Sequence, residues 1–404
     1  METIADMNVL YDAFRASMKS SAWKEEPQRF ETNFLSEITA LQRELEERTY
    51  KTLPGTEFTL HERGKIRHIH GGRIRDRVVR HALCDNVIGP ALHPYIIYNN
   101  GASQTGKGVD FARRMFEQDL HNYWLEHCTN EGYVGFIDLS KFYDNIQHDK
   151  AKEAICPKID EFSAWLLSGI IDTFKIDVSY MSDEEYAGCL QRKFNSIEYF
   201  EKVTPEMKTG DKYMAKSVDI GDQTSQNIGV FYPTPIDNYA TIVCGHRRYG
   251  RYMDDIYIIH HDRAVIERTI AGITQKATEL GLFINEKKTR ICKLSDTFTY
   301  LQFKYFLTDT GKVVKRINPK SVTRERRKLK SYKHLLDRGE MSYDSIKQSY
   351  KSWMGRYAKY MSKKQVQNMK ALYKQLYKED PRWKKDRKGT RSRSQTAQGS
   401  KSCT

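Results

Sequence analysis

Long apolar runs are absent from the chain. Its 404 residues contain no apolar stretch of the length that a transmembrane helix needs, about 18 residues or more. The N-terminal METIADMNVLYDAF lacks the basic region and apolar run of a secretory signal. We therefore expect no membrane association and a cytoplasmic location. A hydrophobic content of 39% still suffices to bury a core.

Paired cysteines are absent as well. The seven cysteines are scattered along the chain, and no two of them form a C-x-x-C pair. Zinc modules and disulfide frameworks both depend on regular cysteine spacing, so neither is indicated. We expect reduced and mostly buried thiols.

Acidic residues are scarce in the C-terminal quarter. Residues 311–404 hold 28 Lys and Arg against 7 Asp and Glu, a balance of +21, whereas the whole chain carries +15. The first 310 residues therefore carry 15 − 21 = −6. A strongly basic segment favours a polyanionic partner, so nucleic-acid binding is expected at the C-terminal end and metal chemistry in the carboxylate-rich remainder.

The N-terminal region predicts helices. Residues 1–55 are charged and repeat apolar residues with a helical period. In LSEITALQRELEERTY one face collects the residues expected to be buried, namely Leu35, Ile38, Leu41 and Leu45. This region is expected to be a packed helical arm.

Further along, residues 58–72 alternate around a glycine and predict a β-hairpin. Residues 73–92 predict a helix that ends near Gly89 and Pro90. An apolar strand or turn, a glycine-rich loop and a long helix should follow. Residues 150–215 begin with an apolar helix and then lose periodicity, which indicates an insertion of unknown role.

Two adjacent aspartates stand inside one of the most apolar stretches, GRYMDDIYIIH. Burying an unpaired carboxylate costs several kcal/mol, so Asp254 and Asp255 need either exposure at a turn or a compensating cation. A second apolar segment, FIDLSKFYD, delivers Asp138. Two strands that each present a carboxylate are the arrangement of a two-metal phosphoryl-transfer site, with the ions about 4 Å apart.

A series of segments resembles, in order, the motifs of reverse transcriptases. They resemble in particular the bacterial group that includes group II intron-like, retron, diversity-generating and defence-associated enzymes. Residues 60–310 carry it in GKIRHIH with RDRVVRHALC, NNGASQTGKG, FIDLSKFYDNI, IGDQTSQ, YMDD, GLFINEKKT and YLQFKYF. The resemblance implies an α+β, right-hand polymerase with fingers, a palm of antiparallel sheet plus helices, and a helical thumb.

The same resemblance implies a metal site. Asp138 and Asp254 would ligate two Mg²⁺ ions, with Asp255 beside them and the carbonyl of Leu139 as a further ligand. Magnesium is a hard ion that carboxylates and substrate phosphates hold well, and Mn²⁺ can substitute for it.

The resemblance also implies nucleotide contacts. Lys65 and Arg67 match triphosphate-binding cations. Tyr143 matches a ring that excludes a 2′-hydroxyl, and a core aromatic is the alternative for it. Lys288 matches the position that could protonate the leaving pyrophosphate, with Lys287 as a structural competitor. For Arg73, Arg75 and Arg77 a solvated role, template contact and substrate contact stay open.

Two departures from the family pattern concern fidelity and primer binding. Ile220 and Gly221 stand where most relatives have Gln-Gly. An apolar side chain cannot offer the hydrogen bonds of glutamine near the base pair, which suggests relaxed base selection. This form resembles diversity-generating and several defence-associated enzymes. Leu301, Gln302 and Phe303 stand where Leu-Gly-Phe is common, a departure that concerns the shape of the hairpin that grips the primer.

Three other functions fit parts of the sequence less well. GASQTGKG fits the spacing of a phosphate-binding P-loop, but Gly108 stands where Ser or Thr should follow the lysine. A non-catalytic RNA-binding module would explain the basic C-terminal end, but not the three carboxylates. An RNA-templated RNA polymerase shares the aspartates, and Tyr143 argues against it.

These expectations divide the chain into five parts. They are an N-terminal helical arm (1–55), fingers (56–132), a palm that includes the segment at about 150–215 (133–308), a basic helical thumb (309–380) and a disordered basic tail (381–404). The expected partners are an RNA template or structured non-coding RNA, a DNA product and dNTPs. An accessory protein or a homo-oligomer stays open. The leading biological role is antiviral defence with a cognate RNA, and error-prone copying in a diversity-generating retroelement is the alternative.

Overall fold

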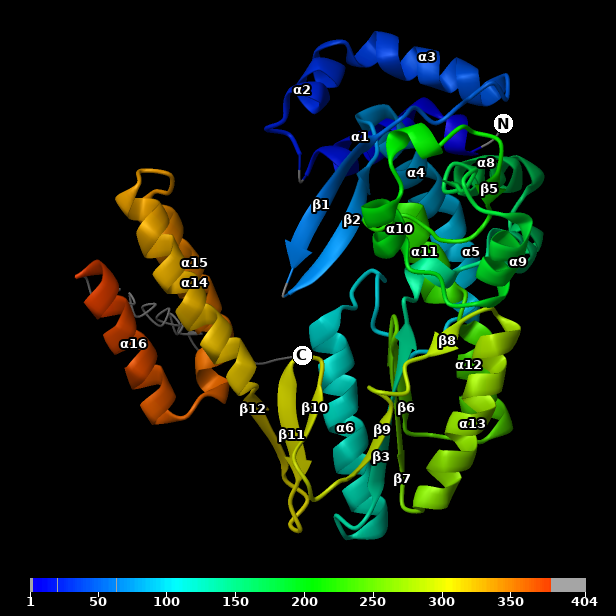
Figure 1. Cartoon of the computed structure of the whole chain (residues 1–404). Helices are drawn as coiled ribbons and strands as arrows, with labels where there is room; N and C mark the ends of the chain where they lie inside the picture. Colours follow the sequence, from blue (N-terminus) through cyan, green and yellow to red (C-terminus); the bar gives the residue numbers. More distant parts are fainter. Residues whose placement is uncertain (1–2, 20, 63, 379–404) are drawn as a thin grey trace, which may run out of the picture. The chain divides into compact units, whose positions relative to one another are not determined.

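The computed structural model of the chain describes residues 3–19, 21–62 and 64–378 (Figure 1). Two compact units divide the chain. The first holds the residues up to Leu301 together with Tyr305–Val314, and the second holds Gln302–Lys304 and the residues from Lys315 onward. Among the described residues, no helix combines the length and the apolar character that crossing a membrane requires.

The first unit opens with three helices, α1 (Met7–Met18), α2 (Glu25–Thr32) and α3 (Phe34–Glu46), after a short 3-10 turn, η1 (Thr3–Ala5). The helical prediction for this region is confirmed, and Ile38, Leu41 and Leu45 are buried. Leu35 was predicted wrongly, since 73% of its surface is exposed. In the same first turn of α3 it is Phe34, the preceding residue, that packs against the core, with its ring 4.9 Å from that of Phe14.

The predicted hairpin is present as β1 (Thr56–Glu62) and β2 (Lys65–Gly71), paired antiparallel. The register sets Glu57 opposite His70 and Leu60 opposite Arg67. Since successive side chains of a strand point to opposite faces, Glu57 and His70 share one face and Arg67 lies on the other. The hairpin therefore has two chemically different faces.

The helix after the hairpin does not stop at Gly89 and Pro90. Three consecutive helical segments, α4 (Ile74–Leu83), the π-helical η2 (Cys84–Ile88) and α5 (Gly89–Leu92), lead into the 3-10 turn η3 (His93–Tyr95). Proline is tolerated in the first turn of a helix because no amide donor is needed there, and Pro90 occupies such a position in α5. The sequence prediction missed this renewed start.

A five-stranded antiparallel sheet forms the centre of the first unit, in the order β6-β7-β3-β8 with β9 also paired to β3. Its strands are β3 (Tyr133–Ser140), β6 (Tyr249–Tyr252), β7 (Asp255–His260), β8 (Phe283–Ile284) and β9 (Arg290–Lys293). Two long helices, α6 (Val109–His127) and α13 (Arg263–Glu279), flank it (Figure 1).

These two helices cover opposite faces of the sheet. A Cβ atom on Gly135 would meet Ile266 of α13, whereas the neighbouring Phe136 faces the ring of Phe116 in α6. Adjacent strand residues point to opposite faces. The centre of the sheet is therefore buried on both sides, which explains why β3 and β7 are apolar nearly throughout.

The segment expected to be an insertion is folded. It contains α7 (His148–Ile155), α8 (Glu161–Asp172), α9 (Asp183–Gln191) and α10 (Ser196–Lys202), with a two-stranded sheet of β4 (Ile176–Asp177) and β5 (Tyr213–Met214) and the short turns η4 (Tyr143–Asn145), η5 (Cys156–Lys158) and η6 (Pro205–Met207). It has a small hydrophobic core of its own, made by Val178, Met181, Phe194, Tyr199, Val203 and Met214. After it come α11 (Gln223–Phe231), α12 (Thr234–Asn238) and the π-helical η7 (Tyr239–Val243).

A three-stranded sheet follows, with β10 (Phe298–Tyr300), β11 (Phe303–Leu307) and β12 (Val313–Ile317) in that order. The second unit has α14 (Pro319–Asp337), α15 (Tyr343–Tyr357), η8 (Ala358–Tyr360) and α16 (Lys363–Tyr377). Its own core contains Leu329, Ile346, Tyr350, Met354, Met369 and Tyr373. The helical prediction for residues 319–377 is confirmed, and the expected basic tail at 381–404 lies outside the described residues.

Candidate active site

The two adjacent aspartates lie at a tight turn between β6 and β7. Tyr252 pairs with Asp255, which leaves Met253 and Asp254 as a two-residue hairpin loop. Met253 has a φ of 53°, a left-handed conformation that costs a non-glycine residue about 1–2 kcal/mol. Strain of this kind is concentrated at functional sites. The turn holds Asp254 at its tip and Asp255 at the first position of β7.

Asp138 lies beside this turn on the neighbouring strand. Its Cα is the register partner of Asp255 in the pair of β3 and β7. The next amide, that of Leu139, donates a hydrogen bond to the carbonyl of Asp254 at 3.1 Å. The tertiary structure thus sets the backbone of Asp138 beside the Asp254–Asp255 pair, from which the sequence separates it. A set of carboxylate oxygens suits a hard divalent cation such as Mg²⁺.

A buried ion pair that was not predicted from the sequence underlies the turn. Arg251 and Asp237 both have fully buried side chains, and their closest atoms are 2.7 Å apart. The guanidinium also donates to the carbonyls of Val230 at 2.7 Å and Met253 at 3.4 Å. Tyr249 donates its hydroxyl to Asp237 at 2.7 Å. The available signal was an arginine inside an otherwise apolar strand.

Lys288 reaches the carboxylates from the loop between β8 and β9. Its ammonium group lies 2.6 Å from Oδ1 of Asp138. Nearby, the amide of Asn285 donates to the carbonyl of Asp138 at 2.7 Å. The backbone of Asp138 is thus hydrogen-bonded to the loop that carries Lys288. This backbone pairing, together with the attraction between the two charges, holds Lys288 next to Asp138.

Tyr143 follows β3 in η4 and is half-buried. Its hydroxyl lies 3.8 Å from Sδ of Met253. Burial, and then the negative charge of Asp254, raise the pKa of Tyr143, so the ring stays neutral and lies within electrostatic range of the aspartates. A Cβ atom on Gly229 would approach the hydroxyl to 3.1 Å, which makes glycine at that position part of the ring's pocket.

The predicted triphosphate-binding cations lie on β2. Arg67 lies within electrostatic range of Tyr143, because its positive charge partly offsets the rise in the pKa of that tyrosine. The backbone of Lys65 lies two residues earlier on the same face, while its side chain lies outside the described part of the structure. The hairpin face that carries Arg67 therefore lies on the side of Tyr143.

Ile220 and Gly221 form the loop that enters α11. Gly221 has a φ of 103°, which favours glycine, and a Cβ there would lie 3.5 Å from Ile69 of β2. The following residue, Asp222, caps α11 by accepting amide hydrogen bonds from Thr224 at 2.8 Å and Ser225 at 3.2 Å. Asp222 also forms a buried ion pair with Arg80 of α4.

The arginines of the segment RIRDR serve the N-terminal helices. Arg75 pairs with Glu44 of α3, and Arg77 donates to Ser17 and Ser21 near the end of α1. Arg73 donates to the carbonyl of Pro54 at 3.0 Å. These contacts favour structural roles for all three over the substrate contacts that the sequence left open.

Arg113 of α6 is a further residue that sequence reasoning missed. Its guanidinium donates to the carbonyl of Leu301 at 3.0 and 2.7 Å and pairs with Asp110 at 2.8 Å. Leu301 and Gln302 both have positive φ values, 39° and 74°. Arg113 thereby stabilises a strained turn, at the position where glycine is common in the motif.

The P-loop alternative does not fit this local structure. In the described chain, the residues before the glycine-rich segment form η3 and turns, with an isolated bridge from Asn100 to Arg251 but no named strand. The ammonium group of Lys107 donates to the carbonyl of Tyr98 at 2.8 Å and to Gln104 at 3.1 Å. The ammonium group of Lys107 therefore stabilises this loop by hydrogen bonds, whereas a P-loop lysine binds phosphate.

Comparison with known protein families matches residues 62–305 to the family described as reverse transcriptase (RNA-dependent DNA polymerase). The matched range contains every candidate site residue. A search of curated proteins finds no match. Asp138, Asp254, Asp255, Lys288 and Tyr143 are gathered in one region, with Arg67 nearby and the Ile220 loop against the hairpin.

Proposed function

The chain belongs to the reverse transcriptase family, and from that premise we propose how its residues divide the work of DNA synthesis. Membership makes it an RNA-directed DNA polymerase, a nucleotidyltransferase that uses an RNA template and dNTPs and produces DNA. The family also implies a right-hand polymerase fold, consistent with the mixed helices and sheets. Divalent metal ions are the family's general cofactor.

We place the metal site at Asp138, Asp254 and Asp255, with the carbonyl of Leu139 as a further ligand. The observation that carries this proposal is the pairing of Asp138 with Asp255, together with the hydrogen bond of 3.1 Å from the Leu139 amide to Asp254. Two Mg²⁺ ions, or Mn²⁺ in their place, would activate the primer 3′-hydroxyl and stabilise the leaving pyrophosphate.

The surrounding side chains bind and orient the nucleotide in this proposal. Tyr143 presents its ring to the sugar and excludes a 2′-hydroxyl, and Arg67 with Lys65 binds the triphosphate. Lys288 donates a proton to the leaving pyrophosphate. Ile220 and Gly221 contact the new base pair. The apolar side chain of Ile220 can discriminate between base pairs by their shape but forms no hydrogen bonds with them.

The division into fingers, palm and thumb at residues 56–132, 133–308 and 309–380 is likewise a proposal. The central antiparallel sheet with its aspartates supports the palm, and the hairpin with Arg67 supports the fingers. The long helices α14, α15 and α16 of the second unit support the thumb. Its excess of Lys and Arg suits a phosphate backbone.

For the biological role, we propose antiviral defence in the cytoplasm of a bacterium with a cognate structured RNA. Ile220 also fits the alternative, a diversity-generating retroelement, because mutagenic copying requires relaxed base selection. The RNA that copurifies with the chain separates the two roles. A dedicated structured RNA supports defence, whereas a template repeat matching a variable protein gene overturns it.

The experiment that tests the polymerase site is primer extension on an RNA template with the Asp254→Asn variant. Extension should be abolished while RNA binding stays near the wild-type level, because only the metal-binding charge is removed. Asp296→Asn, in an exposed turn outside the site, is the matched control and should extend normally. Extension by Asp254→Asn at the wild-type rate would contradict the assignment.

A further inference from the structure

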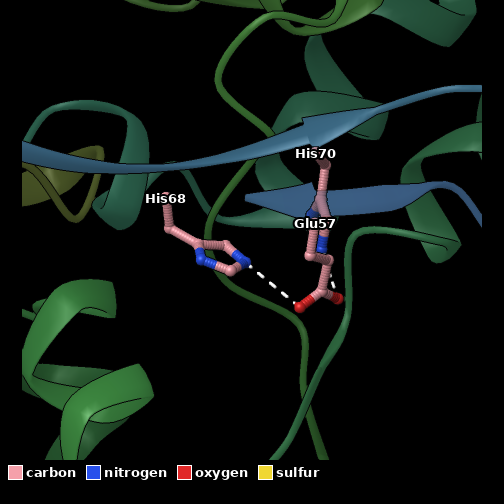
Figure 2. A group of neighbouring side chains, drawn as sticks. All are labelled: Glu57, His68 and His70. Atoms are coloured by element: carbon pink, nitrogen blue, oxygen red, sulfur yellow. Dashed lines mark hydrogen bonds and ion pairs between the residues drawn. The ribbon is translucent and has the colours of Figure 1, made fainter. Parts of the chain in front are cut away.

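The face of the hairpin opposite Arg67 carries a second cluster of potential metal ligands. Glu57 comes from β1, and His68 and His70 come from β2. One ligand atom from each residue lies within 4.8 Å of the other two. Figure 2 shows the three side chains pointing towards one another, with the Glu57 carboxylate between the imidazoles.

We propose that Glu57, His68 and His70 form a binding site for one divalent transition-metal ion, with Zn²⁺ as the best fit. Two imidazole nitrogens and one carboxylate oxygen are a common zinc donor set, whereas Mg²⁺ prefers oxygen ligands alone. This site goes beyond the proposed polymerase function, since the hairpin separates it from the face that carries Arg67.

The distances suit a tetrahedral ion. Ligand atoms about 2.0 Å from zinc at tetrahedral angles are about 3.3 Å from each other. Nε2 of His68 lies 3.2 Å from Oε2 of Glu57, and Nε2 of His70 lies 2.6 Å from Oε1. These two distances run to different oxygens of the Glu57 carboxylate. The side chain is about half exposed, so a rotation with a small outward movement would place one oxygen at the required distance from both imidazoles.

Two further observations point to a ligand. Nε2 of His68 is buried, and its 3.2 Å contact with Glu57 is an ion pair that lacks hydrogen-bond geometry, which is unfavourable for a buried nitrogen. Nδ1 of His70 lies 2.8 Å from Oδ1 of Asp219. A carboxylate on the far nitrogen of a histidine is the usual partner that orients a metal-binding imidazole.

The surroundings leave room for a fourth ligand. The three residues line a cavity of about 220 Å³, several times the roughly 30 Å³ that one water molecule occupies in the liquid. Lys175 and Lys208 line the same cavity. The ring of His68 stacks on Phe200 of α10 at 3.7 Å, which fixes its plane. A water molecule or an anionic oxygen would complete the coordination.

The position of Asp219 gives this ion a structural consequence. Asp219 immediately precedes Ile220 and Gly221, so the ion would couple both strands of the hairpin, through His70, to the loop proposed to contact the new base pair. We infer a positioning role for the metal.

The test is zinc titration of the full chain after removal of metals with a chelator. Calorimetry should show one zinc ion per chain that survives Asp254→Asn, because the catalytic aspartates are not its ligands. His68→Ala and His70→Ala should each lower the affinity at least tenfold. His61→Ala, on the same hairpin but outside the cluster, is the matched control and should bind as the wild type does.

Folding of the variants is checked by circular dichroism, and His68→Gln with His70→Gln provides milder replacements. Zinc should raise the Tm of the wild type and of His61→Ala, but not that of the cluster variants. The proposal is overturned if the wild type binds no zinc. It is also overturned if the substitutions of His68 and His70 leave the zinc affinity unchanged. Primer extension with Mg²⁺ is measured separately, so failure of the zinc site leaves the polymerase assignment intact.

Discussion

The ammonium group of Lys288 lies 2.6 Å from the Asp138 carboxylate, across 150 residues of sequence. Lys288 keeps 48% of its side chain exposed, while Asp138 keeps 11%. The lysine therefore occupies a place beside the carboxylate where a metal cation would be attracted. When metal binds, a long and partly exposed side chain can turn towards the leaving group at little cost.

Lys288→Met should separate these two roles. The loss of a proton donor should lower kcat by about 10²- to 10⁴-fold, while the loss of a competing cation should lower the Mg²⁺ concentration needed for half-maximal activity. Steady-state extension at varied Mg²⁺ measures both. Lys287→Met, at the exposed neighbouring position, should change neither, and an unaltered kcat in Lys288→Met would remove it from the chemistry.

Tyr143→Ala should admit ribonucleotides, because the half-buried ring that we place under the sugar is removed. The ratio of kcat/KM for dNTP to that for the matching NTP should fall at least tenfold. Tyr143→Phe keeps the ring and loses only the hydroxyl near Met253, so its discrimination should match the wild type. Equal discrimination in all three proteins would make Tyr143 a core aromatic.

Ile220→Gln should increase fidelity, since the new amide can hydrogen-bond near the base pair. We expect a severalfold fall in the substitution rate, measured by sequencing the DNA copied from a defined RNA. Ile220→Val keeps an apolar side chain and serves as the control, with an error rate near that of the wild type. A rate that is the same in all three proteins would locate base selection elsewhere.

Arg113→Met should weaken the turn at Leu301. It leaves the Leu301 carbonyl without its two hydrogen bonds, and an unsatisfied buried acceptor costs about 1–3 kcal/mol. Urea unfolding should show this loss, and the KM for primer should rise more than kcat falls. Arg114→Met, at an exposed position of the same helix, should do neither. A wild-type KM for primer would limit Arg113 to stability.

Asp119 predicts a pH dependence of stability. Burial raises its pKa from 3.8 to about 6, against hydrogen bonds from Tyr257 and Asn99. The native state therefore holds this proton more tightly than the unfolded state does, so stability falls as pH rises from about 4 to 6 and is constant above. The shift corresponds to about 3 kcal/mol.

Asp119→Asn should remove that part of the pH profile and unfold at higher urea above pH 6, while keeping an oxygen that accepts from Tyr257. Urea unfolding at a series of pH values measures this. Asp296→Asn, in an exposed turn, should follow the wild-type profile. If Asp119→Asn is less stable than the wild type at neutral pH, the buried carboxylate is stabilising and the expected sign is wrong.

Local sequence patterns predicted the structure correctly where it depends on the residues of a single helix, strand or hairpin. The alternation around Gly64 gave the hairpin of β1 and β2, and the apolar run before Asp138 gave β3, because strand periodicity is a property of neighbouring residues. They failed at Leu35, whose exposure depends on where α3 meets its partners. They also failed at Pro90, where a π-helical segment precedes a new helical turn.

The sequence by itself determined which residues could do chemistry. Burying an aspartate inside an apolar strand costs several kcal/mol unless a cation or exposure at a turn compensates. Asp138, Asp254 and Asp255 can therefore be identified as candidates from the sequence alone. The tertiary structure decided which of them meet. Strand pairing sets Asp138 against Asp255, a buried Arg251 and Asp237 hold the turn, and Asp219 reaches His70 across 149 residues. These contacts join distant segments, and no local pattern encodes them.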